Sequence, residues 1–60
     1  MMNTYNCYWI HDQAGCRFID ADNSFAARKQ FRDEYNNQHN AHIEVHECIA
    51  IRVIKPERHQ

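Results

Sequence analysis

Histidine and cysteine are the residue types in this chain with the most obvious capacity for chemistry. The 60 residues include five His and three Cys. His46 and Cys48 stand two apart in a predicted strand, so both could reach one metal ion from the same face. Structural zinc sites usually contain two such closely spaced pairs, and no second pair matches this one. The sequence therefore predicts no metal and no cofactor, and a metal-stabilised miniature domain is the weaker alternative.

Two other kinds of cysteine chemistry receive little support. In the strand register predicted below, a Cys7–Cys16 disulfide would need a shifted turn, so we expect free thiols. His11, Asp12 and Cys16 crowd that turn, but the sequence indicates neither a third orienting group nor an enclosed pocket. A chain of this length also leaves little volume for a substrate cleft. We therefore expect that the protein is not an enzyme.

The first half of the chain reads as a β-hairpin. Residues 4–11 form one predicted strand, and residues 16–20 form the next. Between them, residues 12–15 (Asp-Gln-Ala-Gly) fit a type I turn, with Gly15 in a left-handed conformation that closes a three-residue loop.

This hairpin register places Ile10 opposite Phe18 and Trp9 opposite Ile19. Successive strand residues point to opposite faces, and a slip by one residue would exchange the faces. The first strand is apolar on both faces: Tyr5, Cys7 and Trp9 lie on one, and Tyr8 and Ile10 on the other.

A helix is predicted over residues 25–37, with Ser24 preferred as its N-cap. Residues at four-residue spacing predict its core-facing stripe: Ala27, Phe31 and Tyr35. Residues 42–54 alternate between apolar and polar side chains, which predicts a third strand. Glu47 occupies a position where the alternation requires an apolar residue, so we expect a bulge or break near residues 46–48.

These elements predict an α+β fold of order ββαβ, a mostly antiparallel three-stranded sheet with one helix packed on one face. We expect the third strand beside the first, which makes the aromatic strand central; pairing parallel to the second strand is the alternative. Residues 1–60 form a single small domain in this prediction, with an ordered core at 4–54 and a polar tail at 55–60.

Charge and composition exclude some classes of function. Seven Lys and Arg against eight Asp and Glu give a formal net charge of −1, so no global basic field attracts nucleic acid. Residues 1–4 resemble no secretory segment, and no run approaches the ~20 apolar residues of a membrane span. We therefore expect a cytoplasmic protein with no membrane partner and reduced thiols.

The leading functional prediction is a non-catalytic module that docks on another protein or on itself. An apolar sheet face without a helix would be its docking surface. The predicted anchors are Tyr5, Trp9 and Ile19, or Tyr8 and Ile10 in the slipped register, with Arg17 and Arg52 as rim contacts. The alternative is a small nucleic-acid-binding regulator that uses a basic helix surface of Arg28, Lys29 and Arg32.

In size, element order and lack of catalytic motifs, the chain resembles the short accessory and early proteins of tailed bacteriophages. Some of these proteins inhibit host enzymes. The resemblance implies a modulator of a host protein that acts in the host-cell cytoplasm. It covers the element pattern of residues 4–54 and assigns no site residues.

Overall fold

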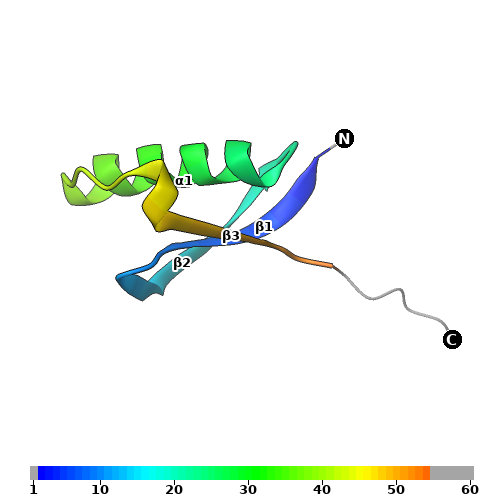
Figure 1. Ribbon diagram of the computed structural model, residues 1–60, viewed down its shortest axis with the longest axis horizontal. Coiled ribbons are helices and arrows are strands. Elements are labelled where there is room, and N and C mark those ends of the chain that lie inside the picture. Colours follow the sequence, from blue (N-terminus) through cyan, green and yellow to red (C-terminus); the bar gives the residue numbers. More distant parts are fainter. Residues whose placement is uncertain (1, 55–60) are drawn as a thin grey trace, which may run out of the picture.

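The computed structural model of the protein describes residues 2–54. Its elements, in chain order, are β1 (Asn3–Trp9), β2 (Asp12–Ala21), α1 (Ser24–His39), the 3₁₀ helix η1 (Val45–Glu47) and β3 (Cys48–Arg52). The sheet has the order β2-β1-β3, and both strand pairs are antiparallel. In Figure 1, α1 lies along one face of the sheet. The predicted α+β fold and the central position of the aromatic strand are confirmed.

The core lies between the sheet and α1. Phe31 of the helix has no exposed surface, and neither has Cys7 of the central strand. The other buried residues come from all three strands, the helix and the segment after it: Tyr5, Ile19, Ala21, Ala27, Tyr35, Ile43 and Cys48. The predicted helix stripe is therefore confirmed.

The predicted turn at residues 12–15 is wrong. Residues 10 and 11 form the connection, and β2 already begins at Asp12. Ile19 consequently pairs with Tyr5, and Phe18 with Asn6. Around Tyr5 the register differs from the predicted one by four residues, an even number, so the side chains predicted to share a face still share one there. An irregularity between Cys7 and Trp9 then pairs Trp9 with Asp12, which lies on the helix side.

A contact with the helix explains why Asp12 does not form the predicted turn. The Tyr35 hydroxyl donates a hydrogen bond of 2.9 Å to Asp12 Oδ2, which ties the start of β2 to α1. Gly15 does not have a positive φ. A Cβ at this position would lie 2.9 Å from Asp12 Oδ2, so glycine provides room for the carboxylate there.

The helix begins and ends slightly outside the predicted range. Asn23, not Ser24, is the N-cap, and its Oδ1 accepts a hydrogen bond of 2.8 Å from the Ala26 N–H. At the other end Asn40 has φ 52° and ψ 44°, the left-handed conformation that Asn tolerates well at a helix C-terminus. The helix therefore runs two residues beyond the predicted end at 37, to His39.

The third strand is shorter than predicted. β3 covers only Cys48–Arg52, and η1 occupies the place where Glu47 disturbs the alternation. The expected break is confirmed, whereas the strand predicted over residues 42–47 is wrong. The predicted polar tail, residues 55–60, lies outside the described part of the chain.

Candidate functional site

The face of the sheet opposite α1 is the first candidate surface. It carries alternate residues of the three strands and of the chain beside them: Tyr8, Ile10, Phe18, Ile49, Ile51 and Val53. We call this surface the open face. Phe18 is 70% exposed, Ile51 53% and Ile10 45%. Within residues 2–54 no helix or strand covers it, as Figure 1 shows.

Asn6 is a polar residue in the middle of the open face. It belongs to the central strand and lies between Phe18 of β2 and Ile51 of β3. Its Oδ1 is buried and has no hydrogen-bond partner in the described structure. An unsatisfied buried acceptor costs about 1–3 kcal/mol, so this amide oxygen needs a donor that the monomer does not supply.

Fixed charge on the open face is confined to its margin. Asp20 lies there, and its Oδ1 accepts a hydrogen bond of 2.6 Å from the Thr4 hydroxyl. Exposed Cys16 lies on the same face by strand alternation. Cys7 faces α1 instead, so these two thiols point to opposite sides of the sheet.

The open face includes only part of the predicted docking set. Tyr5 and Ile19 are 6% and 4% exposed beneath α1, so the prediction that they are surface anchors is wrong. Trp9 also faces the helix, and its ring centroid lies 5.7 Å from that of Tyr35. Tyr8, the alternative anchor of the slipped register, does lie on the open face.

The predicted rim arginines are on the helix side of the sheet. Arg17 makes an ion pair of 3.1 Å with Glu34, and its guanidinium carbon lies 5.9 Å from the Phe31 ring centroid. It therefore braces β2 against α1 and is no rim contact of the open face. Arg52 is opposite Tyr5 at the end of β3, where its side chain is exposed.

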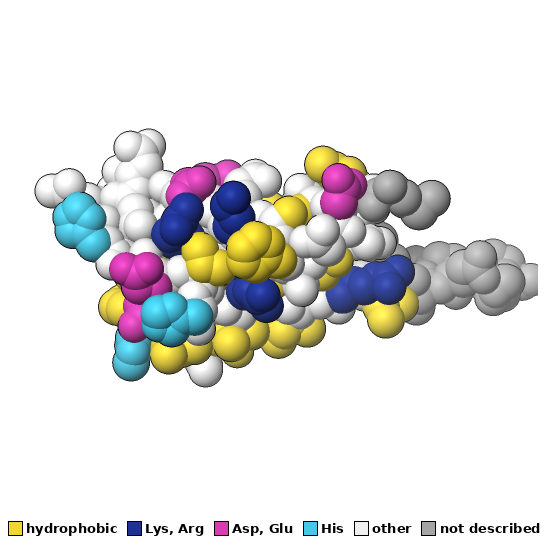
Figure 2. All heavy atoms as spheres, turned by 45° about the horizontal axis from the view of Figure 1, so that its top comes forward, with side chains coloured by type: hydrophobic (Ala, Val, Ile, Leu, Met, Phe, Trp, Pro, Cys, Tyr) yellow, Lys and Arg dark blue, Asp and Glu magenta, His cyan; other side chains and the backbone are white. Residues whose placement is uncertain are grey.

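A groove beside β3 is the second candidate surface, and we call it the edge groove. Its volume is about 580 Å³, and it is lined by Phe25, Arg28, Glu44, Val45, His46, Cys48 and Ile49. It lies between the first half of α1 and the η1–β3 segment. Figure 2 shows this side of the molecule, with Lys and Arg side chains around central hydrophobic ones.

Of the three residues of the predicted basic helix surface, one is paired with a carboxylate in the described structure and two are not. Arg32 Nη2 lies 2.7 Å from Asp33 Oδ1, so its charge is matched. Arg28 and Lys29 have no carboxylate partner in the described structure, and the charged groups of both lie 5.9 Å from the Phe25 ring centroid.

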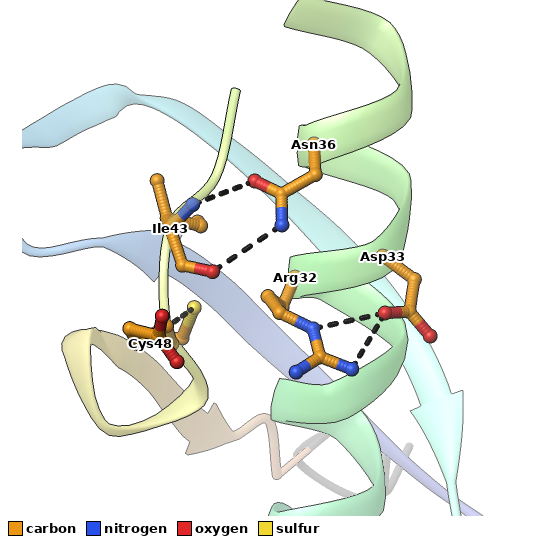
Figure 3. A network of polar contacts seen from close by, with 6 residues as sticks. Arg32, Asp33, Asn36, Ile43 and Cys48 are labelled. Atoms are coloured by element: carbon orange, nitrogen blue, oxygen red, sulfur yellow. Dashed lines mark hydrogen bonds and ion pairs between the residues drawn. The ribbon is translucent and has the colours of Figure 1, made fainter. Parts of the chain in front are cut away.

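One wall of the edge groove depends on a clamp from the helix. Asn36 Oδ1 accepts a hydrogen bond of 2.8 Å from the Ile43 N–H, and Asn36 Nδ2 donates one of 3.2 Å to the Ile43 carbonyl (Figure 3). Glu44 follows at once, and its carbonyl accepts from the Cys48 thiol at 3.4 Å. The sequence prediction missed Asn36, because one Asn among several polar neighbours carries no distinguishing signal.

We expect Asn36→Ala to lower the free energy of unfolding by about 1–2 kcal/mol, because it leaves both Ile43 backbone groups unpaired. Thermal denaturation followed by circular dichroism measures the loss. Asn37→Ala is the matched control, since the neighbouring side chain is exposed and should change stability by less than about 0.5 kcal/mol. Equal losses in the two variants would contradict the clamp.

The buried thiols are poorly suited to reactive chemistry. Burial, followed by the neighbouring Cys48, raises the pKa of Cys7 from 9.0 to about 11. Burial and then Glu47 raise the pKa of Cys48. A raised pKa keeps a thiol protonated and weakly nucleophilic at neutral pH. Among residues 2–54, no three His, Cys, Asp or Glu side chains are grouped to hold a metal.

The hairpin end of the molecule carries a cluster of rings. The Trp9 ring centroid lies 4.9 Å from His11, and Tyr35 lies 4.3 Å from His39. Trp9 Nε1 is buried and has no hydrogen-bond partner that meets the usual distance and angle limits. Its N–H nevertheless lies near enough to the Glu47 carboxylate to contribute to lowering the pKa of that group. The main cause of that lowering is the backbone N–H of Glu44, which donates to Glu47 Oε1 at 3.2 Å.

Comparison with protein-family models, curated proteins and solved structures finds no match to this chain. The resemblance to phage proteins therefore stays a prediction. Over the described residues, no helix has the length and apolar character needed to cross a membrane. Two surfaces of a small α+β fold, the open face and the edge groove, are the basis for functional inference.

Proposed function

We propose that this protein is a non-catalytic protein–protein interaction module that self-associates through its open face. The observation that carries the proposal is the exposure of Phe18, at 70%, in a sheet face that also exposes Ile51 and Ile10. Contiguous exposed apolar surface in a soluble fold commonly marks an interaction site. An antiparallel sheet can leave a polar face in water, but an apolar face needs a cover, and a second sheet is one of the usual covers.

The charge distribution favours a second copy as the occupant. Face-to-face pairing of two open faces brings few charges together, because Asp20 lies at the margin and is hydrogen-bonded to Thr4. Like-charge repulsion would therefore oppose this contact only weakly.

Asn6 supports a symmetric contact. In a two-fold interface the same patch of each copy meets itself, so a residue near the axis faces its own copy. A primary amide carries both donors and acceptors, so two Asn6 side chains can hydrogen-bond to each other. Because Oδ1 is covered within the monomer, the amide has to rotate toward the surface for this pair to form.

The size of the open face is compatible with a reversible dimer. Three strands at ~4.8 Å spacing and a seven-residue central strand give a face of roughly 14 by 24 Å. A standard specific interface buries about 800 Å² per partner, which is about a sixth of the 4593 Å² surface of this chain. The flat outline of the open face, roughly 340 Å², is less than half of that area, so the open face fits a weak, concentration-dependent dimer below the standard class.

The test replaces Phe18 by a charged residue. We expect wild-type protein to approach twice its 7.3 kDa chain mass as its concentration rises, and Phe18→Asp to sediment as a monomer over the same concentration series. Since Phe18 is mostly exposed, the variant should keep its circular dichroism spectrum and a single thermal transition.

Phe25→Asp is the matched control, because Phe25 is also exposed, at 56%, but lies on the helix side. It should remain dimeric. A monomeric wild type would overturn self-association, as would a Phe18→Asp dimer. The phage-type modulator of a host protein is the competing outcome, in which a monomer forms a stoichiometric complex with a different chain.

A further inference from the structure

We propose that the free edge of β3 and the edge groove bind an extended acidic peptide segment, which adds to the sheet as a fourth strand. This site shares only Ile49 with the open face and does not depend on self-association. Three features carry the inference: unpaired backbone groups along β3, an apolar hollow beside them, and cations without carboxylate partners. Strand addition to an exposed sheet edge is a common mode of peptide recognition.

The backbone of β3 presents hydrogen-bonding groups on its outer side. The Val53 N–H donates to the Thr4 carbonyl at 2.8 Å, and the Ile10 N–H donates to the Glu47 carbonyl at 3.0 Å. Alternate residues of an antiparallel strand bond to the same neighbour, so the odd-numbered residues of this segment bond to β1. The N–H and C=O groups of Ala50 and Arg52 therefore point outward. In the described part of the chain no further strand pairs with them.

The edge groove offers room for one apolar side chain of such a strand. Phe25 stands on the α1 side and is 56% exposed. Val45 and Ile49 line the groove on the η1–β3 side. A volume of about 580 Å³ is larger than one aliphatic side chain needs, so water or a neighbouring ligand residue would share it.

The charges next to this edge favour an acidic ligand. Arg28 and Lys29 project around Phe25, and Arg52 is exposed on the helix side of β3. Within residues 2–54 none of the three forms an ion pair. Glu44 is the one carboxylate that lines the groove, and it precedes η1. We therefore expect the apolar ligand residue near η1 and the acidic residues toward the Arg52 end of β3.

The same charges argue against a second copy at this edge. Pairing of two β3 edges would bring the Arg28 and Lys29 of one copy toward those of the other, which is repulsive. Nucleic acid is also a poor fit, because the unpaired backbone N–H and C=O groups match a peptide strand.

The experiment uses the blocked, fluorescein-labelled hexapeptide Thr-Ile-Thr-Asp-Thr-Asp as the probe, with fluorescence anisotropy as the readout. In an extended strand its Ile and both Asp side chains point to one side, as the groove and the cations require. We expect saturable binding that weakens with added salt. Replacing both Asp by Lys should weaken binding at least about tenfold, since each tenfold step corresponds to only about 1.4 kcal/mol.

Two changes separate the backbone and charge contributions. A probe in which Pro replaces the second of the three Thr residues lacks one backbone N–H donor. It should bind at least about tenfold more weakly. In the protein, Arg28→Glu should weaken the Asp-containing probe about tenfold and strengthen the Lys-containing one. Arg32→Gln is the matched control on the same helix, because Arg32 is already paired with Asp33, and it should change affinity less than about threefold.

Binding should be the same for wild type and Phe18→Asp, so a failure of self-association leaves this test intact. Amide chemical-shift changes should concentrate at residues 49–52. The proposal is overturned by no binding of the probe, by equal affinity for the Asp and Lys probes, or by full affinity of the Pro probe. Shifts confined to β1 and β2, such as at Tyr8 and Phe18, or tighter binding of a single-stranded oligonucleotide, would overturn it as well.

Discussion

Phe31→Ala is expected to remove about 3–5 kcal/mol, a third or more, of the free energy of unfolding. Phe31 has no exposed surface and is among the largest fully buried side chains. Its ring centroid lies 5.6 Å from that of Tyr35, and the Arg17 guanidinium carbon lies 5.9 Å from it. Truncation of a buried Phe costs about 3–5 kcal/mol, whereas a domain of this size has a total stability of roughly 3–9 kcal/mol.

Urea denaturation followed by circular dichroism measures this loss. Phe25→Ala removes the same ring from the same helix at a position that is 56% exposed, so it should cost less than about 1 kcal/mol. A comparable loss in both variants would show that burial beneath the sheet is not what makes Phe31 important.

A loss of stability between pH 9 and pH 11 is the second large effect that we expect. Burial and then Cys48 hold the pKa of Cys7 at about 11 in the folded protein, against 9.0 for an ordinary thiol. Burial raises the pKa of Cys48 as well, and burial and then the hydrogen bond to Asp12 raise that of Tyr35. A group whose pKa rises on folding stabilises the protein fully below its unfolded pKa and loses this contribution as pH approaches its folded pKa.

The size of this effect follows from the Cys7 shift. Two pKa units correspond to about 2.7 kcal/mol, and solvent close to the core of so small a protein reduces this to about 2 kcal/mol. The free energy of unfolding, measured by urea titration at a series of pH values, should therefore fall by that amount. Cys7→Ala should flatten the dependence, while Cys16→Ala should preserve it, because the Cys16 thiol is exposed. An unchanged slope in Cys7→Ala would refute the assignment.

Much of the fold follows from periodicity. The spacing of Ala27, Phe31 and Tyr35 identified the buried side of α1, and the two-sided aromatic character of β1 identified the central strand. These patterns are set by burial over several residues, so a change in one local contact does not remove them. Strand alternation correctly grouped Tyr8 with Ile10, but the leading prediction exposed the opposite set, Tyr5, Trp9 and Ile19, and only the slipped register placed Tyr8 on the uncovered face.

The errors arose where a long-range contact overrides a local preference. Asp12 and Gly15 have the composition of a turn, but the hydroxyl of Tyr35, 23 residues further on, holds Asp12 at the start of β2. In the same way Asn36 takes the backbone of Ile43 and prevents an early start of β3. Neither partner can be recognised from its neighbours in sequence.

The candidate surfaces differ in how far the sequence could define them. Strand alternation was sufficient to group the residues of the open face, but it did not decide which face of the sheet the helix covers. The edge groove depends on which half of α1 lies beside β3 and on the position of η1, and these follow only from the packed structure. The sequence predicted Arg28 as part of a basic helix surface, but no pattern indicated that it would line a groove with Phe25.

The position of β3 also has a consequence for how the molecule assembles. The β1–β2 hairpin joins neighbouring segments, whereas Tyr5 meets Arg52 only after the whole helix has intervened. Closing that long loop has the larger entropic cost, so β3 is the strand that we expect to dock last and to detach first. A ligand on the outer edge of β3 would bind only molecules in which β3 is docked on β1. It would therefore reduce the fraction of molecules in which β3 has detached.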